Sequence, residues 1–293
     1  MANTLVQDLV ESGIHFGQRA SGWNPKMGPY IYGKRNGIHI IDIKETIKGL
    51  LLAKRFITKT VLEGKDVCFV GTKRQAKNVL ESRVPAVKMH YVTERWLGGT
   101  LTNFRTIRSR LRRLEELEAI ENSNNFASYS KKMESQLKRE KKKIQRNLEG
   151  VRKMEKLPGV MVVIDTKSEV TALKEARKLG IPTICLIDTD GDPEMADIAI
   201  PGNDDSMRSI DVVVRELCLA IAEGFQQREA KQMELQAANA ANAQNNQGGN
   251  TMAGEPGAGG ARRSRRSQFR SDESAGGPEG GAGGAIAEPA AKA

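Results

Sequence analysis

The chain has 293 residues, a net charge of +10 at neutral pH and a hydrophobic fraction of 39%. It contains no run of about 18 apolar residues, which excludes a membrane-spanning helix. The N-terminal stretch lacks the order of basic and then apolar residues that a secretory signal has. Three cysteines without paired spacing predict a reducing compartment, so the expected location is the cytoplasm.

The charge is distributed unevenly along the chain. Residues 1–104 and residues 105–156 each hold 16 Lys or Arg against 8 Asp or Glu, although the second segment is half as long. Residues 157–230 hold 7 against 14, and residues 231–293 hold 7 against 6. A basic half joined to an acidic half is typical of a protein that binds a polyanion. Nucleic acid is favoured over acidic lipid.

Apolar, β-branched runs alternate with helical stretches over most of the chain. Strands are expected at residues 38–43, 66–70, 89–92, 160–165, 183–188 and 196–200. Helices are expected at residues 44–63, 74–82, 169–179 and 206–228. Continuous apolar strands that alternate with helices predict a parallel sheet covered on both faces, so the expected class is a doubly wound α/β fold.

Residues 104–156 break this alternation. Apolar residues from Ile107 to Leu117 follow one face of a helix, and a second helical run follows the turn-forming residues 122–125. So narrow an apolar seam cannot build a globular core, but it can close a two-helix coiled-coil hairpin. The other faces are crowded with Lys and Arg beyond what solubility needs, which favours RNA contact over a merely solvated helix pair.

The composition changes again from about residue 230, where Ala, Gly, Asn and Gln dominate. Residues 231–293 are expected to be a disordered tail, because a segment without apolar periodicity cannot offset its chain entropy. Its basic island, residues 261–270, is interpreted either as a nonspecific RNA tether or as part of a solubilising tail. The expected layout is an α/β RNA-binding domain at 1–104 and 157–230, a basic coiled-coil hairpin inserted at 105–156, and the tail.

Signatures of an enzyme are mostly absent. Neither of the glycine-rich patterns that cradle nucleotide phosphates is present. The nearest approach, VGTKRQA at residues 70–76, is either an ordinary strand-to-helix turn or a site for one phosphate, and its Lys73 and Arg74 would suit RNA. The cysteines are not expected to be catalytic, since Cys68 and Cys185 lie in apolar strands where a thiol behaves as a small hydrophobe.

No metal or cofactor is expected. The acidic stretch at residues 188–197 lacks the geometry of a calcium loop, because Pro193 stands where the sharp turn needs Gly. The three histidines have no zinc-ligand spacing. Two of them, His39 and His90, lie in expected strands and are interpreted as satisfied core residues.

The loop at residues 21–37 interleaves aromatic side chains with cations. Trp23, Tyr30 and Tyr32 alternate with Lys and Arg across several Pro and Gly residues. Aromatic faces stack on bases or riboses while cations neutralise phosphates, so the pattern predicts RNA contact. The alternative is that the aromatic residues pin the loop to the core.

A second loop, RWLGGTLTNF at residues 95–104, repeats the theme. Gly98 and Gly99 permit close approach of the backbone, and Arg95 offers a bidentate fork to phosphate. Thr100 or Thr102 is expected to cap the following helix.

The candidate RNA-binding residues come from these two loops, from the turn at residues 70–76 and from the basic helices. They are Trp23, Lys26, Tyr30, Lys34, Arg35, Lys73, Arg74, Arg95, Arg108, Arg110, Arg112, Arg113, Lys141, Lys142 and Lys143.

Several long stretches resemble the S-two family of bacterial small-subunit ribosomal proteins. They are GIHFGQ (13–18), WNPKMGPYIYGKRNGIHIIDI (23–43), FVGTKRQA (69–76), RWLGGTLTNF (95–104), LPGVMVVID (157–165), KLGIPTICLIDT (178–189) and IPGNDDSMRSI (200–210). The resemblance implies a flavodoxin-like sheet with a protruding coiled-coil hairpin. It also implies contact with small-subunit rRNA and neighbouring ribosomal proteins, and help in recruiting ribosomal protein S-one. Members of the family often carry a second histidine where this chain has Gln18, so no metal is expected at His15.

Two other classes of function, an enzyme and a membrane-surface protein, fit the sequence less well. An enzyme for nucleotides or sugar phosphates on the same fold would need the phosphate fingerprint that the sequence lacks. A membrane-surface protein would need an apolar face rich in Trp or Phe on the basic hairpin, where Phe104 and Phe126 are the only such residues. The predicted function is therefore a structural, rRNA-binding constituent of the small ribosomal subunit, with no catalytic residue and no membrane partner.

Overall fold

The structure, a computed structural model, describes residues 2–122 and 130–248. The chain divides into one unit of residues Met1–Asn242 and a second of residues Ala243–Ala293. The basic island at residues 261–270 and most of the turn expected at residues 122–125 lie outside the described residues. No helix within the described ranges is long and apolar enough to cross a membrane.

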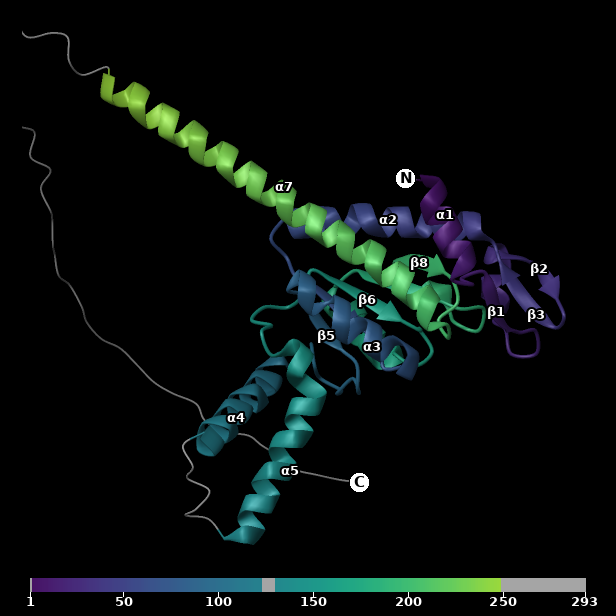
Figure 1. Ribbon diagram of the computed structural model, residues 1–293, viewed down its shortest axis with the longest axis horizontal. Helices are drawn as coiled ribbons and strands as arrows, with labels where there is room; N and C mark the ends of the chain where they lie inside the picture. The colour runs from purple at the N-terminus through teal and green to yellow at the C-terminus, as the bar shows by residue number, and fades with distance from the viewer. Residues whose placement is uncertain (1, 123–129, 249–293) are drawn as a thin grey trace, which may run out of the picture. The chain divides into compact units, whose positions relative to one another are not determined.

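Most of the helices and strands expected from the sequence are present in the structure (Figure 1). The α-helices are α1 (Ala2–Glu11), α2 (Ile43–Leu62), α3 (Arg74–Arg83), α4 (Phe104–Asn122), α5 (Lys131–Leu148), α6 (Val170–Leu179) and α7 (Met207–Gly248). The strands are β1 (Phe16–Arg19), β2 (Ile31–Arg35), β3 (Ile38–Ile41), β4 (Val67–Val70), β5 (His90–Val92), β6 (Val160–Ile164), β7 (Thr183–Ile187) and β8 (Ile198–Pro201). Short 3₁₀ turns are η1 (Pro25–Tyr30), η2 (Pro85–Val87), η4 (Glu149–Val151) and η5 (Pro193–Met195).

The larger sheet is parallel, with the strand order β5-β4-β6-β7-β8 (Figure 1). Val70 pairs with Val92 of β5 on one side and Val163 of β6 on the other, so the strand order reverses at β4. Every residue of β4, β6 and β7 is buried, which explains their unbroken apolar sequences. The predicted α/β class with a parallel sheet is confirmed, and the arrangement is consistent with a doubly wound fold.

Two apolar clusters cover the two faces of this sheet. Successive strand residues point to opposite faces, so Phe69 packs with buried residues of α1, α2, α3 and α7. Its neighbours Cys68 and Val70 pack with buried residues of α4, α6 and the end of α5. Burial raises the pKa of the Cys68 thiol to about 12, consistent with a thiol that behaves as a small hydrophobe.

The strand predicted at residues 38–43 does not join the parallel sheet. Instead, β3 is the centre of a small antiparallel sheet between β1 and β2. Asn36 and Gly37, with φ of +50° and +79°, form the two-residue turn between β2 and β3. Two consecutive positive φ angles are what a tight hairpin requires. The prediction was wrong here because the apolar run outweighed this Asn-Gly turn signal.

Helix α7 begins where it was expected but continues to Gly248 instead of ending at Arg228. One face of its first half is buried as far as Gly224, although Met207 and Leu219 are exposed, and residues 231–236 are exposed as well. Ala, Gln, Glu, Lys and Met have high intrinsic helix propensity and form helix without a core. The expectation of disorder therefore does not hold for residues 231–248.

Helices α4 and α5 occupy the segment that breaks the α/β alternation, and they contact each other. Ile107, Leu111, Leu114 and Leu117 of α4 are buried, as their spacing predicted. Arg113 forms an ion pair with Glu140 of α5, with 3.5 Å between Nε and Oε1.

Candidate nucleic-acid interface

The small antiparallel sheet carries the first aromatic and basic loop. Trp23 packs on His39, with 5.1 Å between ring centroids, and Tyr32 is 80% exposed. Among the residues that the structure describes, neither buried ring nitrogen of His39 has a hydrogen-bond partner, so its interpretation as a satisfied core residue was wrong. Tyr30 packs against the core, as the pinning alternative required, whereas Tyr32 is free to stack.

The cations of this loop differ in what they contact. Lys26 Nζ donates to Asp192 Oδ2 at 3.0 Å and to Glu194 Oε2 at 2.5 Å, and these hydrogen bonds raise the pKa of the Lys26 ammonium. Lys34 and Arg35, at the end of β2, are exposed and form no ion pair within the described part of the chain. Lys26 therefore fastens the loop to the acidic segment after β7, while Lys34 and Arg35 remain available to an outside anion.

The turn at residues 70–76 is occupied by the chain's own carboxylates. Lys73 Nζ lies 2.6 Å from Asp204 Oδ1, 3.0 Å from Asp205 Oδ1 and 3.3 Å from Asp165 Oδ2. The Thr72 amide donates to Glu169 Oε1 at 3.1 Å. Enzymes of doubly wound folds bind ligands at this edge, where the strand order reverses. RNA contact by Lys73 stays a prediction, and its charge is already paired within the protein. Arg74 is exposed.

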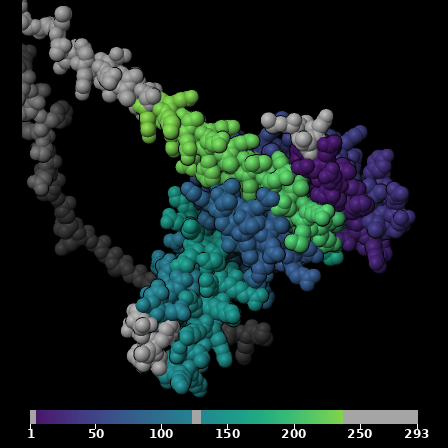
Figure 2. All heavy atoms as spheres, viewed as in Figure 1, coloured from purple at the N-terminus to yellow at the C-terminus, as the bar shows by residue number. Residues whose placement is uncertain are grey.

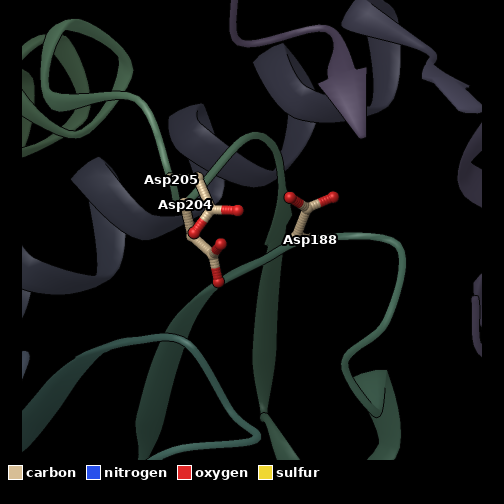
Figure 3. A group of neighbouring side chains, drawn as sticks. All are labelled: Asp188, Asp204 and Asp205. Atoms are coloured by element: carbon tan, nitrogen blue, oxygen red, sulfur yellow. The ribbon is translucent and has the colours of Figure 1, made fainter. Parts of the chain in front are cut away.

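Asp188, Asp204 and Asp205 gather at the same edge of the sheet (Figure 3), with one carboxylate oxygen of each within 4.8 Å of the others. Gln18 Nε2 donates to Asp205 Oδ2 at 2.5 Å and to Asp188 Oδ2 at 3.3 Å. The group could hold a cation, and the Lys73 ammonium already balances part of its charge. None of the three was among the expected site residues, although the acidic stretch at residues 188–197 fits a carboxylate-rich loop that caps strand ends. The signal was that each Asp closely follows an apolar strand, since parallel strands end at one edge.

The second loop, residues 95–102, wraps around the buried Glu175 of α6. Its carboxylate accepts hydrogen bonds from the amides of Gly99, Leu101 and Thr102 and from the Trp96 indole. Gly99 has a φ of +90°, which glycine adopts readily. Arg95 is exposed at the start of the loop.

The expected helix cap is not made by either threonine. The Thr100 hydroxyl donates to the Leu97 carbonyl at 2.5 Å, and the Thr102 hydroxyl donates to Glu175 Oε2 at 3.3 Å. Instead, Asn103 lies directly before the helix, and its side-chain Oδ1 accepts a hydrogen bond from the Thr106 hydroxyl at 2.8 Å. The sequence could not reveal this, because a buried Glu from a distant helix takes the Thr102 hydroxyl.

The candidate cations of α4 and α5 fall into two groups. Arg108 Nη1 donates to the Met154 carbonyl at 3.1 Å. Arg113 pairs with Glu116 at 2.9 Å, and Lys141 pairs with Glu121. The remaining candidates are exposed and form no ion pair in the described residues; they are Arg110, Arg112, Lys142 and Lys143.

These basic helices and the small antiparallel sheet lie at different ends of the first unit (Figures 1 and 2). The unpaired candidate cations are therefore split between two surfaces. A small anion could not contact both at once, whereas an extended polyanion could.

Glu94, between β5 and the second loop, attaches α5 to the α/β core. It accepts from Arg146 Nε at 2.7 Å and Nη2 at 2.5 Å, and it also pairs with Lys77 of α3. The hydrogen bonds from Arg146 and then Lys77 lower the pKa of Glu94 from 4.5 to about 2. The stabilisation is thus fully present above pH 4.5 and lost as the pH falls toward 2.

We expect the urea midpoint of the unsubstituted protein to decrease as the pH falls from 4.5 toward 2. The urea midpoint of Glu94→Gln should decrease less over the same range, because this variant has no carboxylate at position 94 to protonate. Urea titrations at several acidic pH values, followed by circular dichroism, measure this difference. The control Glu45→Gln, at an exposed pair with Lys48 on α2, should follow the unsubstituted protein. Parallel curves for Glu94→Gln and the unsubstituted protein would contradict the assignment.

Comparison with known proteins gives one consistent family. A family model described as "Ribosomal protein S2" matches residues 9–224. The small ribosomal subunit protein uS2 of Rhodopirellula baltica is 53% identical over 231 residues, covering 79% of this chain and 89% of that protein. The protein uS2c of Guillardia theta is 48% identical over 224 residues, covering 76% and 95%. The protein uS2 of Salinispora arenicola is 46% identical over 233 residues, covering 79% and 84%.

Proposed function

Because the chain belongs to the ribosomal protein S2 family, whose members are structural proteins of the small ribosomal subunit and not enzymes, we propose that it binds small-subunit rRNA directly. The observation that carries the proposal is the set of exposed, unpaired cations on two separate surfaces. One surface, which we call the loop surface, contains Tyr32, Lys34 and Arg35. The other, the helix surface, contains the unpaired cations of α4 and α5, and we assign to it the exposed Arg95, which precedes α4 in the chain.

The two surfaces suit an RNA backbone for different reasons. The loop surface combines an exposed Tyr ring with two cations, the pairing that stacks on bases while neutralising phosphates. The helix surface offers cations spaced along helices, which suits a run of phosphates. We further propose that α4 and α5 form the predicted coiled-coil hairpin, which would carry these cations away from the α/β core. The ion pairs between α4 and α5 support this.

We also propose contacts with neighbouring small-subunit proteins, ribosomal protein S-one among them, in the cytoplasm. A groove of about 580 Å³ between α1, α3 and α7 supports a protein contact. Met207, at the start of α7, lines this groove and exposes 48% of its surface. The three buried, unpaired cysteines are consistent with a reducing compartment.

We expect the chain to sediment with small subunits on a sucrose gradient, and its binding to small-subunit rRNA to fall steeply with salt. If six to ten phosphates are contacted, affinity should fall by about 10³ to 10⁵ between roughly 50 and 200 mM salt, because counterions are released on binding. Filter binding across a salt series measures the slope. A flat profile, or a chain that stays at the top of the gradient, would overturn the proposed function.

A further inference from the structure

A single buried carboxylate organises the loop that joins β5 to α4. Glu175 exposes 7% of its surface and accepts at both oxygens. Its Oε1 accepts from the Gly99 amide at 2.7 Å and the Trp96 Nε1 at 3.2 Å. Its Oε2 accepts from the amides of Leu101 and Thr102 at 3.0 and 3.2 Å, and from the Thr102 hydroxyl at 3.3 Å.

These donors compensate the cost of burying a charge. Burial alone would raise the pKa of Glu175, but the amides of Gly99, Leu101 and Thr102 outweigh it, so the pKa is lowered and the carboxylate stays ionised. Backbone amides that converge on one point form an anion-binding concavity. In this loop the concavity is filled by the chain's own anion, so these three amides are not available to an RNA phosphate.

The position of the loop gives this contact a consequence for the helix surface. Arg95 comes directly before Trp96, and α4 begins at Phe104, directly after the bonded segment. Trp96 and Leu101 are buried with Ile107 of α4 in one apolar cluster. Glu175 therefore connects α6 to the exposed Arg95 on one side and to the first turn of α4 on the other.

We propose that Glu175 is a positioning residue for RNA binding. It holds Arg95 and the start of α4 in the one orientation in which the cations of the helix surface contact rRNA together. This inference rests on the proposed function. It concerns the orientation of the loop and not only fold stability, because a buried charged group can fix one conformation, as it does in some proteins.

The test uses Glu175→Gln in the full chain. The amide keeps one acceptor oxygen but presents an NH₂ donor to N–H groups, which leaves some of them unpaired. We expect the amides of Gly99, Leu101 and Thr102 to exchange hydrogen about tenfold to a hundredfold faster, since bonds to a charged group are lost. In competition with the unsubstituted chain for small subunits, we expect occupancy to fall about tenfold or more.

The matched control is Glu216→Gln. Glu216 is a buried carboxylate on α7, paired with Lys54 at 2.9 Å, and α7 covers the opposite face of the sheet. The Glu216→Gln variant should be less stable than the unsubstituted protein. Its hydrogen exchange at the amides of Gly99, Leu101 and Thr102 and its occupancy of small subunits should be unchanged. Glu175→Asp keeps the charge on a shorter side chain and should give an intermediate result. It replaces Glu175→Gln in the test if the latter fails to fold by circular dichroism.

Each other outcome overturns a defined part of the argument. Unchanged exchange at the three amides would show that Glu175 does not hold the loop. Faster exchange with full occupancy would show that the loop's order does not matter for binding. An equal loss for Glu216→Gln would reduce the effect to general instability. If the unsubstituted chain itself fails to bind, the proposed function falls and the positioning role falls with it.

Discussion

Replacing Gly49 with alanine should destabilise the fold more than any other single methyl group added to α2. A Cβ at Gly49 would overlap the carbonyl oxygen of Ala199 and lie 3.2 Å from the Cα of Ile200. Both are backbone atoms of β8, so neither can swing away as a side chain can. The Thr46 hydroxyl, which donates to the Pro201 carbonyl at 2.6 Å, holds α2 at this short distance.

Two effects oppose each other in this variant. Alanine gains about 1 kcal/mol over glycine in the middle of a helix. Overpacking of a buried contact costs about 3 kcal/mol at the upper end of its usual range. We therefore expect the free energy of unfolding to fall by about 2 kcal/mol, measured by urea denaturation.

Gly28→Ala is the control, because a Cβ at Gly28 meets no atom within 4 Å. It should change the free energy of unfolding by no more than about 0.5 kcal/mol. Equal unfolding midpoints for Gly49→Ala and the unsubstituted protein would show that separating α2 from β8 costs no more than the roughly 1 kcal/mol that alanine gains in a helix.

The sequence predicted the parallel sheet well because full burial leaves a direct mark on composition. A strand covered on both faces must be apolar throughout, as β4, β6 and β7 are. The sequence-based prediction was wrong for β3, because its apolar run resembles that of a buried strand. In the structure 38% of the surface of Ile38 is exposed. The predicted end of the last helix at Arg228 was also wrong, since α7 continues to Gly248. Apolar periodicity indicates only where a helix packs against a core, whereas a helix without such packing depends on the intrinsic helix propensity of its residues.

The candidate site was predictable only in part, because sequence shows where cations are but not which carboxylates they meet. Lys26 and Lys73 look as basic as Lys34 in the sequence. In the structure both are paired with acids that lie more than a hundred residues away. Glu175 could not be identified either, since its partners lie on a loop that only the fold brings close. The exposure of Lys34 and Arg35, by contrast, could be expected from their turn-forming neighbours Gly33 and Gly37.

Replacing Lys34, Arg35 and Arg95 together with alanine should have the largest effect on subunit binding. All three are exposed and form no ion pair within the described residues, so their charge is available to phosphate. Each lost phosphate contact should reduce the slope of log affinity against log salt by about one, or about three in total. Occupancy of small subunits, in competition with the unsubstituted chain in cells, should fall by about a hundredfold.

The control removes the same charge elsewhere. Lys48 and Lys65 pair with Glu45 and Glu63, and Lys178 is exposed in the last turn of α6. Replacing these three with alanine should leave occupancy close to that of the unsubstituted chain, because two of the charges are already neutralised within the protein. Circular dichroism should show that both triple variants keep the fold.

Ending the chain after Asn242 completes the comparison. Residues 243–293 form a separate unit and hold six Lys or Arg against five Asp or Glu, so they add little net charge. A few scattered cations that are largely balanced by nearby acids contribute little to phosphate binding once salt screens them. The truncated chain should therefore bind subunits almost as well as the full chain. If truncation abolishes occupancy while the Lys34, Arg35 and Arg95 variant retains it, binding depends on the C-terminal unit and not on the surfaces assigned to the first.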